Sequence, residues 1–161
     1  PGMVGVALSH PSITTGLIVD GIHVHPAMVA LAYRSKGAAR FSLVTDAMAA
    51  LGMPPGRYVL GDFEVMVDET SARLADGRLA GSILSLDQAV RNLMAFTGCS
   101  LTEALATATT TPARLLNLSD RGRLAPGCRA DLVVLDADTQ VRQTLIGGKV
   151  VYPTTAQALS R

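Results

Sequence analysis

The first third of the sequence alternates short apolar runs with a helical pattern. Residues 16–20, GLIVD, and residues 41–45, FSLVT, are rich in apolar and β-branched side chains, and each ends at a polar residue. Both predict short buried strands. Between them Pro26 can begin a helix that Gly37 ends. A strand, a helix and a strand at this spacing predict a βαβ unit with parallel strands, which needs helices on both sheet faces.

Three consecutive helices are predicted further along the chain. Residues 85–98 begin with a Ser-x-x-Gln capping box, continue with apolar residues at helical spacing and end at a glycine. Residues 100–108 begin with a second capping box, Ser-x-x-Glu, and predict another helix. The Thr-Pro pair at 111–112 begins a third, shorter helix that is expected to reach about Leu118.

The last part of the chain has a strand pattern. Residues 131–136, 141–146 and 149–152 are apolar runs, and the Gly-Gly pair at 147–148 is a hairpin signal, so these strands are expected to pair antiparallel. Residues 58–79 also predict short strands.

This set of elements is incomplete by itself. Two parallel strands cannot close a barrel or form a large open sheet, so they need partner strands that the sequence does not contain. Those strands could come from a longer parent chain, from another protein, or the fold could be a different one. The chain begins at Pro1 rather than at a methionine, which processing could explain but which also suits a piece of a longer protein.

Composition narrows the classes of function. In 161 residues, a hydrophobic content of 48% is enough for a core and excludes a disordered chain. Charged residues make up 17%, against roughly 25% in an average soluble protein, so part of the surface is expected to contact protein. The net charge is +1 without a run of like charges, which argues against nucleic acid as a partner.

Membrane insertion and disulfide bonds are not expected either. No stretch approaches the roughly 20 apolar residues of a membrane span, and a cytoplasmic protein is predicted. Cys99 and Cys128 lack a CxxC spacing or a neighbouring histidine, which favours two reduced structural thiols.

Candidate chemistry lies where the two predicted parallel strands end. In α/β folds the reactive groups follow the C-terminal ends of such strands. The first end carries His23 and His25 within DGIHVHP, and the second carries Asp46 within LVTDAM. Two histidines make at most half of a zinc site, so helix capping or substrate contact is the stronger interpretation for them. Asp46 could serve as a general base or could simply cap the following turn.

Taken together, GLIVDGIHVHP at 16–26, LVTDAM at 43–48, LAGS at 79–82 and SLDQAVRNL at 85–93 resemble the later half of N-acetylglucosamine-6-phosphate deacetylases. The ending, TTTPARLLNL at 109–118 and GRLAPGCRADLVVLD at 122–136, is similar to amidohydrolases in general. The resemblance covers nearly the whole chain.

The resemblance implies an α/β fold. Residues 1–121 would be the C-terminal part of a distorted (β/α)₈ TIM-like barrel, and residues 122–161 would be the C-terminal part of a small β-sandwich. The N-terminal part of the same enzyme would supply the missing strands. The runs 16–20 and 41–45 would be the last two strands of the barrel.

The implied reaction is metal-dependent removal of the acetyl group from N-acetylglucosamine 6-phosphate, which gives acetate and glucosamine 6-phosphate. Asp46 matches the family's proton-transferring aspartate, and His23 matches a histidine that contacts the sugar phosphate. A substrate-contacting loop matches Leu79, Ala80 and Gly81.

The family's divalent metal, zinc or iron, has its glutamate and histidine ligands upstream of this chain. An upstream arginine of the family reaches a neighbouring subunit's phosphate, which implies a homodimer. The 161 residues alone are therefore expected to be inactive. Two alternatives stay open. One is a different amidohydrolase, such as a cyclic amidase or a deaminase, against which DGIHVHP argues; the other is a non-catalytic fragment that binds its missing half or itself.

Overall fold

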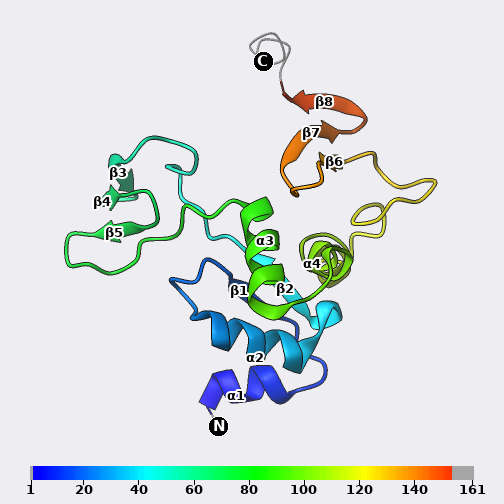
Figure 1. The fold of residues 1–161 in the computed structure, drawn as a ribbon, viewed down its shortest axis with the longest axis horizontal. Coiled ribbons are helices and arrows are strands. Elements are labelled where there is room, and N and C mark those ends of the chain that lie inside the picture. The colour runs from blue at the N-terminus through cyan, green and yellow to red at the C-terminus, as the bar shows by residue number, and fades with distance from the viewer. Residues whose placement is uncertain (1, 154–161) are drawn as a thin grey trace. The chain divides into compact units, whose positions relative to one another are not determined.

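The computed structural model describes residues 2–153 and divides the chain into two compact units, residues 1–108 and residues 109–161. Each unit is described by itself. The described residues contain one parallel two-stranded sheet and two antiparallel three-stranded sheets, together with helices, so the fold is α/β (Figure 1).

The first unit contains the predicted βαβ arrangement. Strand β1 (Thr15–Ile18) pairs in parallel with β2 (Phe41–Val44), and helix α2 (Pro26–Lys36) connects them, followed by a short 3₁₀ turn at Ala38–Arg40. Pro26 stands at the start of α2 and Gly37 is its C-cap, as the sequence predicts. The preceding helix α1 (Gly2–Ser9) was not predicted, because its sequence is apolar on all sides and carries no helical periodicity.

Helices α3 (Leu86–Thr97) and α4 (Leu101–Ala108) confirm both capping boxes. The Ser85 hydroxyl accepts a hydrogen bond from the backbone N–H of Gln88, and Gly98 ends α3 in the left-handed conformation. Ser100 and Glu103 bond one another's backbone N–H groups. Both helices join α2 and the parallel strands in one core, whose largest fully buried side chains include Val19, Val29, Phe41 and Leu93.

A second, smaller core lies in the insertion between β2 and α3. Strands β3 (Gly56–Leu60), β4 (Phe63–Val67) and β5 (Ala72–Leu74) form an antiparallel sheet in sequence order. Val65 and Val67 are buried there, together with Met48, Ala50, Ala72 and Ala80. The face that carries Val59 and Phe63 remains exposed, at 69% and 62% of those residues' surfaces.

The second unit begins with α5 (Thr110–Leu115), which ends three residues earlier than the expected Leu118. Asn117 adopts a left-handed conformation with φ of 57°, and the N–H of Leu118 bonds the carbonyl of Ala113. This geometry closes the helix before Leu118. An asparagine is among the few residues that adopt it readily.

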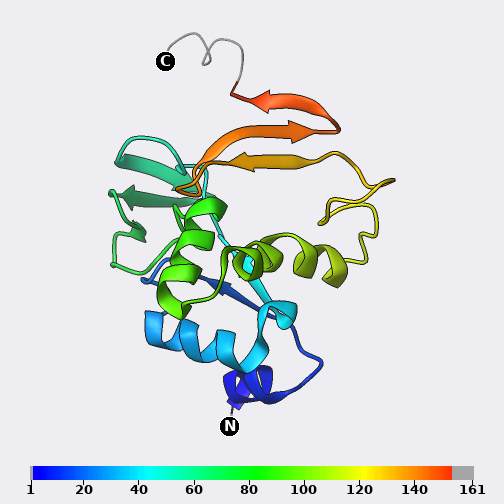
Figure 2. The same ribbon diagram turned by 45° about the vertical axis from the view of Figure 1, so that its right-hand side comes forward.

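Strands β6 (Leu132–Leu135), β7 (Val141–Ile146) and β8 (Lys149–Tyr152) confirm the predicted antiparallel ending. Figure 2 shows them side by side, in yellow to red. Within the described part of this unit only Thr111 and Ala113 are buried, and all four residues of β8 are exposed. Both faces of this sheet therefore lack a packed core.

No described helix is both long and apolar enough to cross a membrane. Both cysteines are free thiols and half-buried.

Candidate functional site at the strand ends

The two predicted strand ends meet at one edge of the parallel sheet. Ile18 of β1 is in register with Val44 of β2, and Asp20 and Asp46 each follow that pair by two residues. Because parallel strands run in the same direction, both carboxylates emerge at the same, C-terminal edge. Asp20 is largely buried there, whereas Asp46 is exposed.

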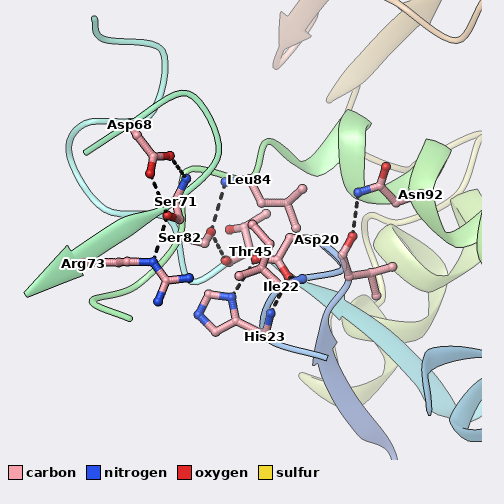
Figure 3. A network of polar contacts seen from close by, with 11 residues as sticks. Asp20, Ile22, His23, Thr45, Asp68, Ser71, Arg73, Ser82, Leu84 and Asn92 are labelled. Atoms are coloured by element: carbon pink, nitrogen blue, oxygen red, sulfur yellow. Dashed lines mark hydrogen bonds and ion pairs between the residues drawn. The ribbon is translucent and has the colours of Figure 1, made fainter. Parts of the chain in front are cut away.

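Asp46 is held by its backbone. Its φ is 51°, one of three positive values among the described non-glycine residues. Its carbonyl accepts a hydrogen bond of 2.8 Å from the N–H of Ser82, and the N–H of Met48 donates to the carbonyl of Ser82 at 2.9 Å. The Ser82 hydroxyl donates to the carbonyl of Thr45 (Figure 3). The strand end is thus fixed by a segment that lies 36 residues later in the sequence.

The candidate substrate loop belongs to this same segment. Ala80 is buried and its N–H bonds the carbonyl of Ala72 at 2.9 Å, while Leu79 forms a bridge with Arg73 of β5. Gly81 has φ of 68°, and a Cβ built on it would lie 2.9 Å from the carbonyl oxygen of Asp46. Only glycine permits this close approach. The structure therefore places Gly81 next to Asp46, with Leu79 and Ala80 preceding it in the same segment.

The imidazole ring of His23 is held in place by the side chain of Asp20. Its Nδ1 lies 2.6 Å from Oδ2 of Asp20, and the other Asp20 oxygen accepts hydrogen bonds from the N–H groups of Ile22 and His23, at 2.9 and 2.8 Å (Figure 3). The side chains of His23 and Asp20 are only 19% and 10% exposed. An ionised carboxylate can only accept, so Nδ1 carries the proton and Nε2 is left to contact a ligand.

These contacts stabilise the ionised form of the Asp20 carboxyl group. Burial acts to raise the pKa of the carboxyl, but hydrogen bonds from the His23 ring and from the N–H groups of His23 and Ile22 outweigh it, so the pKa lies below its usual value. The sequence pointed to the strand end that contains Asp20 but not to its pairing with His23. Their spacing of three residues in a turn could have suggested it.

The other two histidines have structural contacts. His25 caps α2, because its Nδ1 accepts a hydrogen bond from the N–H of Ala27. The capping interpretation is therefore confirmed for His25. His10 is exposed, and its ring accepts a bond from the N–H of Ser12.

A surface pocket of about 480 Å³ lies beside Asp20. Asn92 of α3 lines it and also donates to the carbonyl of Val19 at 2.8 Å, which anchors the end of β1. Glu69 and Thr70, from the turn before β5, add polar groups to the lining. Sequence reasoning missed these three residues, since nothing in their local pattern indicates that the chain brings them to β1.

Residues 2–153 do not by themselves offer a metal centre. No group of three or more His, Cys, Asp or Glu side chains in that range is placed to hold a metal ion. His23 is bonded to Asp20, and His25 caps a helix. A catalytic zinc site generally uses three protein ligands, so the donors of this chain do not fit a complete site.

The sequence matches a known family and named relatives. The pattern of the amidohydrolase family matches residues 5–151. N-acetylglucosamine-6-phosphate deacetylase of Lysinibacillus sphaericus is 45% identical over 154 residues, which cover 96% of this chain and 40% of that protein. A putative N-acetylgalactosamine-6-phosphate deacetylase of Escherichia coli K12 is 45% identical over 151 residues, which cover 93% of this chain and 90% of that protein.

Two solved structures share the fold. N-acetylglucosamine-6-phosphate deacetylase of Thermotoga maritima matches with a TM-score of 0.89 and 44% identity, over 95% of this chain and 42% of that one. A mutant of the Mycobacterium smegmatis enzyme in complex with N-acetyl-D-glucosamine-6-phosphate matches with a TM-score of 0.88 and 39% identity, over 94% of this chain and 41% of that one. The chain thus spans about two fifths of the length of these enzymes.

Proposed function

This chain belongs to the amidohydrolase family, and we propose that it supplies the C-terminal part of an enzyme that deacetylates N-acetylglucosamine 6-phosphate. The products would be glucosamine 6-phosphate and acetate. The names of the relatives at 39% to 45% identity support this substrate. The observation that carries the proposal is the exposed Asp46 carboxylate at the C-terminal edge of the parallel sheet, fixed by the loop 79–82.

Asp46 is the proton-transferring group in this proposal. Its carboxylate accepts a proton from the attacking water and donates it to the nitrogen of the departing amine. An exposed carboxylate suits this role, because it can reach a bound ligand. The backbone contacts of Ser82 and Gly81 support it, since a reactive group must be held in one geometry.

His23 and the loop are the substrate contacts. Nε2 of His23 donates to a phosphate oxygen when the ring carries both protons, and the Asp20 carboxylate orients the ring from the other side. Leu79, Ala80 and Gly81 contact the sugar, and Leu79 and Gly81 are the half-buried members of this stretch.

The metal belongs to the complete enzyme. We propose a divalent zinc or iron ion, bound mostly by residues outside this chain. The described residues do not form that site, so no step of the reaction is assigned to the metal here. This chain's own part is proton transfer and substrate contact.

The parent fold is a distorted (β/α)₈ barrel with a small β-sandwich. Residues 1–121 belong to the barrel, with β1 and β2 as its last strands, and residues 122–161 belong to the sandwich, although 154–161 lie outside the described range. The two-stranded parallel sheet and the uncovered sheet β6–β8 support this assignment, because both need partner strands or a covering layer. The remaining partners are the N-terminal part of the enzyme and a second copy in a homodimer.

N-acetylgalactosamine 6-phosphate is a second candidate substrate. The Escherichia coli relatives named for that sugar phosphate are 45% identical to this chain, the same as the Lysinibacillus sphaericus relative. The two sugars differ in the configuration of one hydroxyl group. Identity alone therefore does not separate them.

The test uses a chimaera. In the Lysinibacillus sphaericus deacetylase, this chain replaces the stretch that it matches, and acetate release is measured with both sugar phosphates. We expect turnover of N-acetylglucosamine 6-phosphate at a rate well above that of its epimer. Turnover of the epimer alone would favour the second candidate, and a folded, metal-loaded chimaera without turnover of either would contradict the proposal.

A further inference from the structure

We infer that Ser82 is a positioning residue for Asp46, which holds the strand end so that the carboxylate points at the substrate. The inference rests on the proposed function, because it takes Asp46 as the reacting group. Ser82 itself is only 2% exposed, so its side chain does not reach the surface where a substrate would bind. It would act only through the backbone of residues 45–48.

Ser82 brackets Asp46 with three hydrogen bonds. Its hydroxyl donates to the carbonyl of Thr45, its N–H donates to the carbonyl of Asp46 at 2.8 Å, and its own carbonyl accepts from the N–H of Met48 at 2.9 Å. Three residues that follow the end of β2 are thereby bonded to Ser82: Thr45, Asp46 and Met48. Ala47 and Ser82 also form an isolated parallel bridge.

The conformation of Asp46 needs such a partner. Its φ of 51° lies in the left-handed region, which costs a non-glycine residue free energy that surrounding contacts must offset, although aspartate tolerates it better than most residues. Without those contacts the residue would return to an extended or right-handed conformation, and its side chain would turn away. The hydrogen bonds from the buried Ser82 therefore stabilise the left-handed conformation of Asp46.

The serine hydroxyl both donates and accepts a hydrogen bond in this arrangement. Besides donating to Thr45, its oxygen accepts a hydrogen bond of 3.1 Å from the N–H of Leu84. Ser82 therefore ties the end of β2 to the start of the segment that leads into α3. Gly81 completes the contact, because a Cβ there would lie 2.9 Å from the Asp46 carbonyl oxygen and would push the two segments apart.

Two substitutions in the chimaera test the inference. Ser82→Ala removes the hydroxyl and keeps the backbone bonds, and Ser82→Cys keeps a weak donor of similar size if the alanine variant fails to fold. A misplacement of about 1 Å can cost about 10²-fold in rate, so we expect kcat to fall by about 10-fold or more. KM should change by less than about threefold, because the substrate contacts of His23 remain.

Ser71→Ala is the matched control. Ser71 is a buried serine of the same unit, and its hydroxyl bonds Asp68 and Arg73 rather than the strand end. We expect it to lower the melting temperature by a similar amount and to leave kcat unchanged.

A double mutant separates positioning from plain stability. If Ser82 acts through the Asp46 carboxylate, Ser82→Ala should cost little further rate in an Asp46→Asn background, because the group that it positions is already inactive. Equal losses in both backgrounds, or an unchanged kcat in Ser82→Ala, would overturn the inference while leaving the proposed function in place. A wild-type chimaera without activity would instead contradict the proposed function.

Discussion

Asp46 and His23 are held in different ways, and this difference decides how each responds to substitution. The conformation of Asp46 is set by hydrogen bonds from both the backbone and the hydroxyl of Ser82 to the backbone of residues 45–48, so the Asp46 side chain can be replaced without disturbing this support. The ring of His23 is set by a side chain, that of Asp20, at 2.6 Å. Removing His23 leaves a largely buried carboxylate without its ring partner.

Asp46→Asn should abolish most deacetylation and leave folding and metal content nearly unchanged. The amide keeps the shape of the side chain but cannot accept a proton, and general acid–base catalysis is typically worth about 10² to 10⁴ in rate. The measurement is kcat for acetate release by the chimaera. Asp62→Asn is the control, because Asp62 is exposed in the turn between β3 and β4. More than about half of the wild-type kcat in Asp46→Asn would remove Asp46 from the proton-transferring role.

His23→Ala should weaken the binding of phosphorylated substrate more than that of unphosphorylated N-acetylglucosamine. The reason is that the phosphate loses a charge-assisted hydrogen bond, worth about 1.5 to 3 kcal/mol. KM for the two sugars and the metal content by elemental analysis are the measurements. His10→Ala serves as the control, since its ring is exposed and bonds only the neighbouring Ser12 N–H among the described contacts. Loss of the metal would instead make His23 a ligand.

At the scale of elements, the sequence predicted best where local chemistry decides the outcome. Helix α3 begins after its capping serine and ends before Gly98, as its pattern indicated. The parallel pairing of β1 with β2 was also predicted, whereas their register, in which Thr15 pairs with Phe41 and Gly16 with Ser42, was not. The contact of Ser82 with the end of β2 could not be predicted, because it joins segments 36 residues apart and the serine hydroxyl bonds a backbone carbonyl, a group that every residue possesses.

The end of α5 offers a prediction about packing between elements. Gly122 has φ of 79°, and a Cβ on it would lie 2.6 Å from the Cβ of Ala113 and 2.8 Å from the carbonyl oxygen of Thr109. Gly127 has φ of 83° but no atom near its Cβ position. Both Gly122→Ala and Gly127→Ala bear a left-handed penalty of roughly 1–2 kcal/mol, so their difference reports the steric clash alone.

Gly122→Ala should therefore destabilise the protein by about 1–3 kcal/mol more than Gly127→Ala. The measurement is thermal unfolding of the two chimaeras under the same conditions. Equal melting temperatures would show that the turn after α5 moves aside at little cost.

At the scale of the whole molecule, the described sheets have open edges and the described residues form no metal site, and both observations bear on whether this chain works alone. The two-stranded parallel sheet leaves backbone groups unpaired at its edges, and β8 has four exposed residues. Apolar side chains on the described strands remain exposed, among them Val59, Phe63, Val133 and Val150. Surfaces of this kind associate with other chains.

Expressed alone, the 161 residues should hold no stoichiometric zinc or iron and should show no deacetylation. Residues 2–153 provide no cluster of three metal-binding side chains, and neither Pro1 nor residues 154–161 contain His, Cys, Asp or Glu. The same chain should self-associate or bind the upstream part of the Lysinibacillus sphaericus relative, because another strand satisfies its open edges better than water does. Light scattering with metal analysis tests both expectations, first on the chain alone and then after mixing with that upstream part. A monomer that carries one tightly bound metal and releases acetate would show that this chain needs no further strands or ligands.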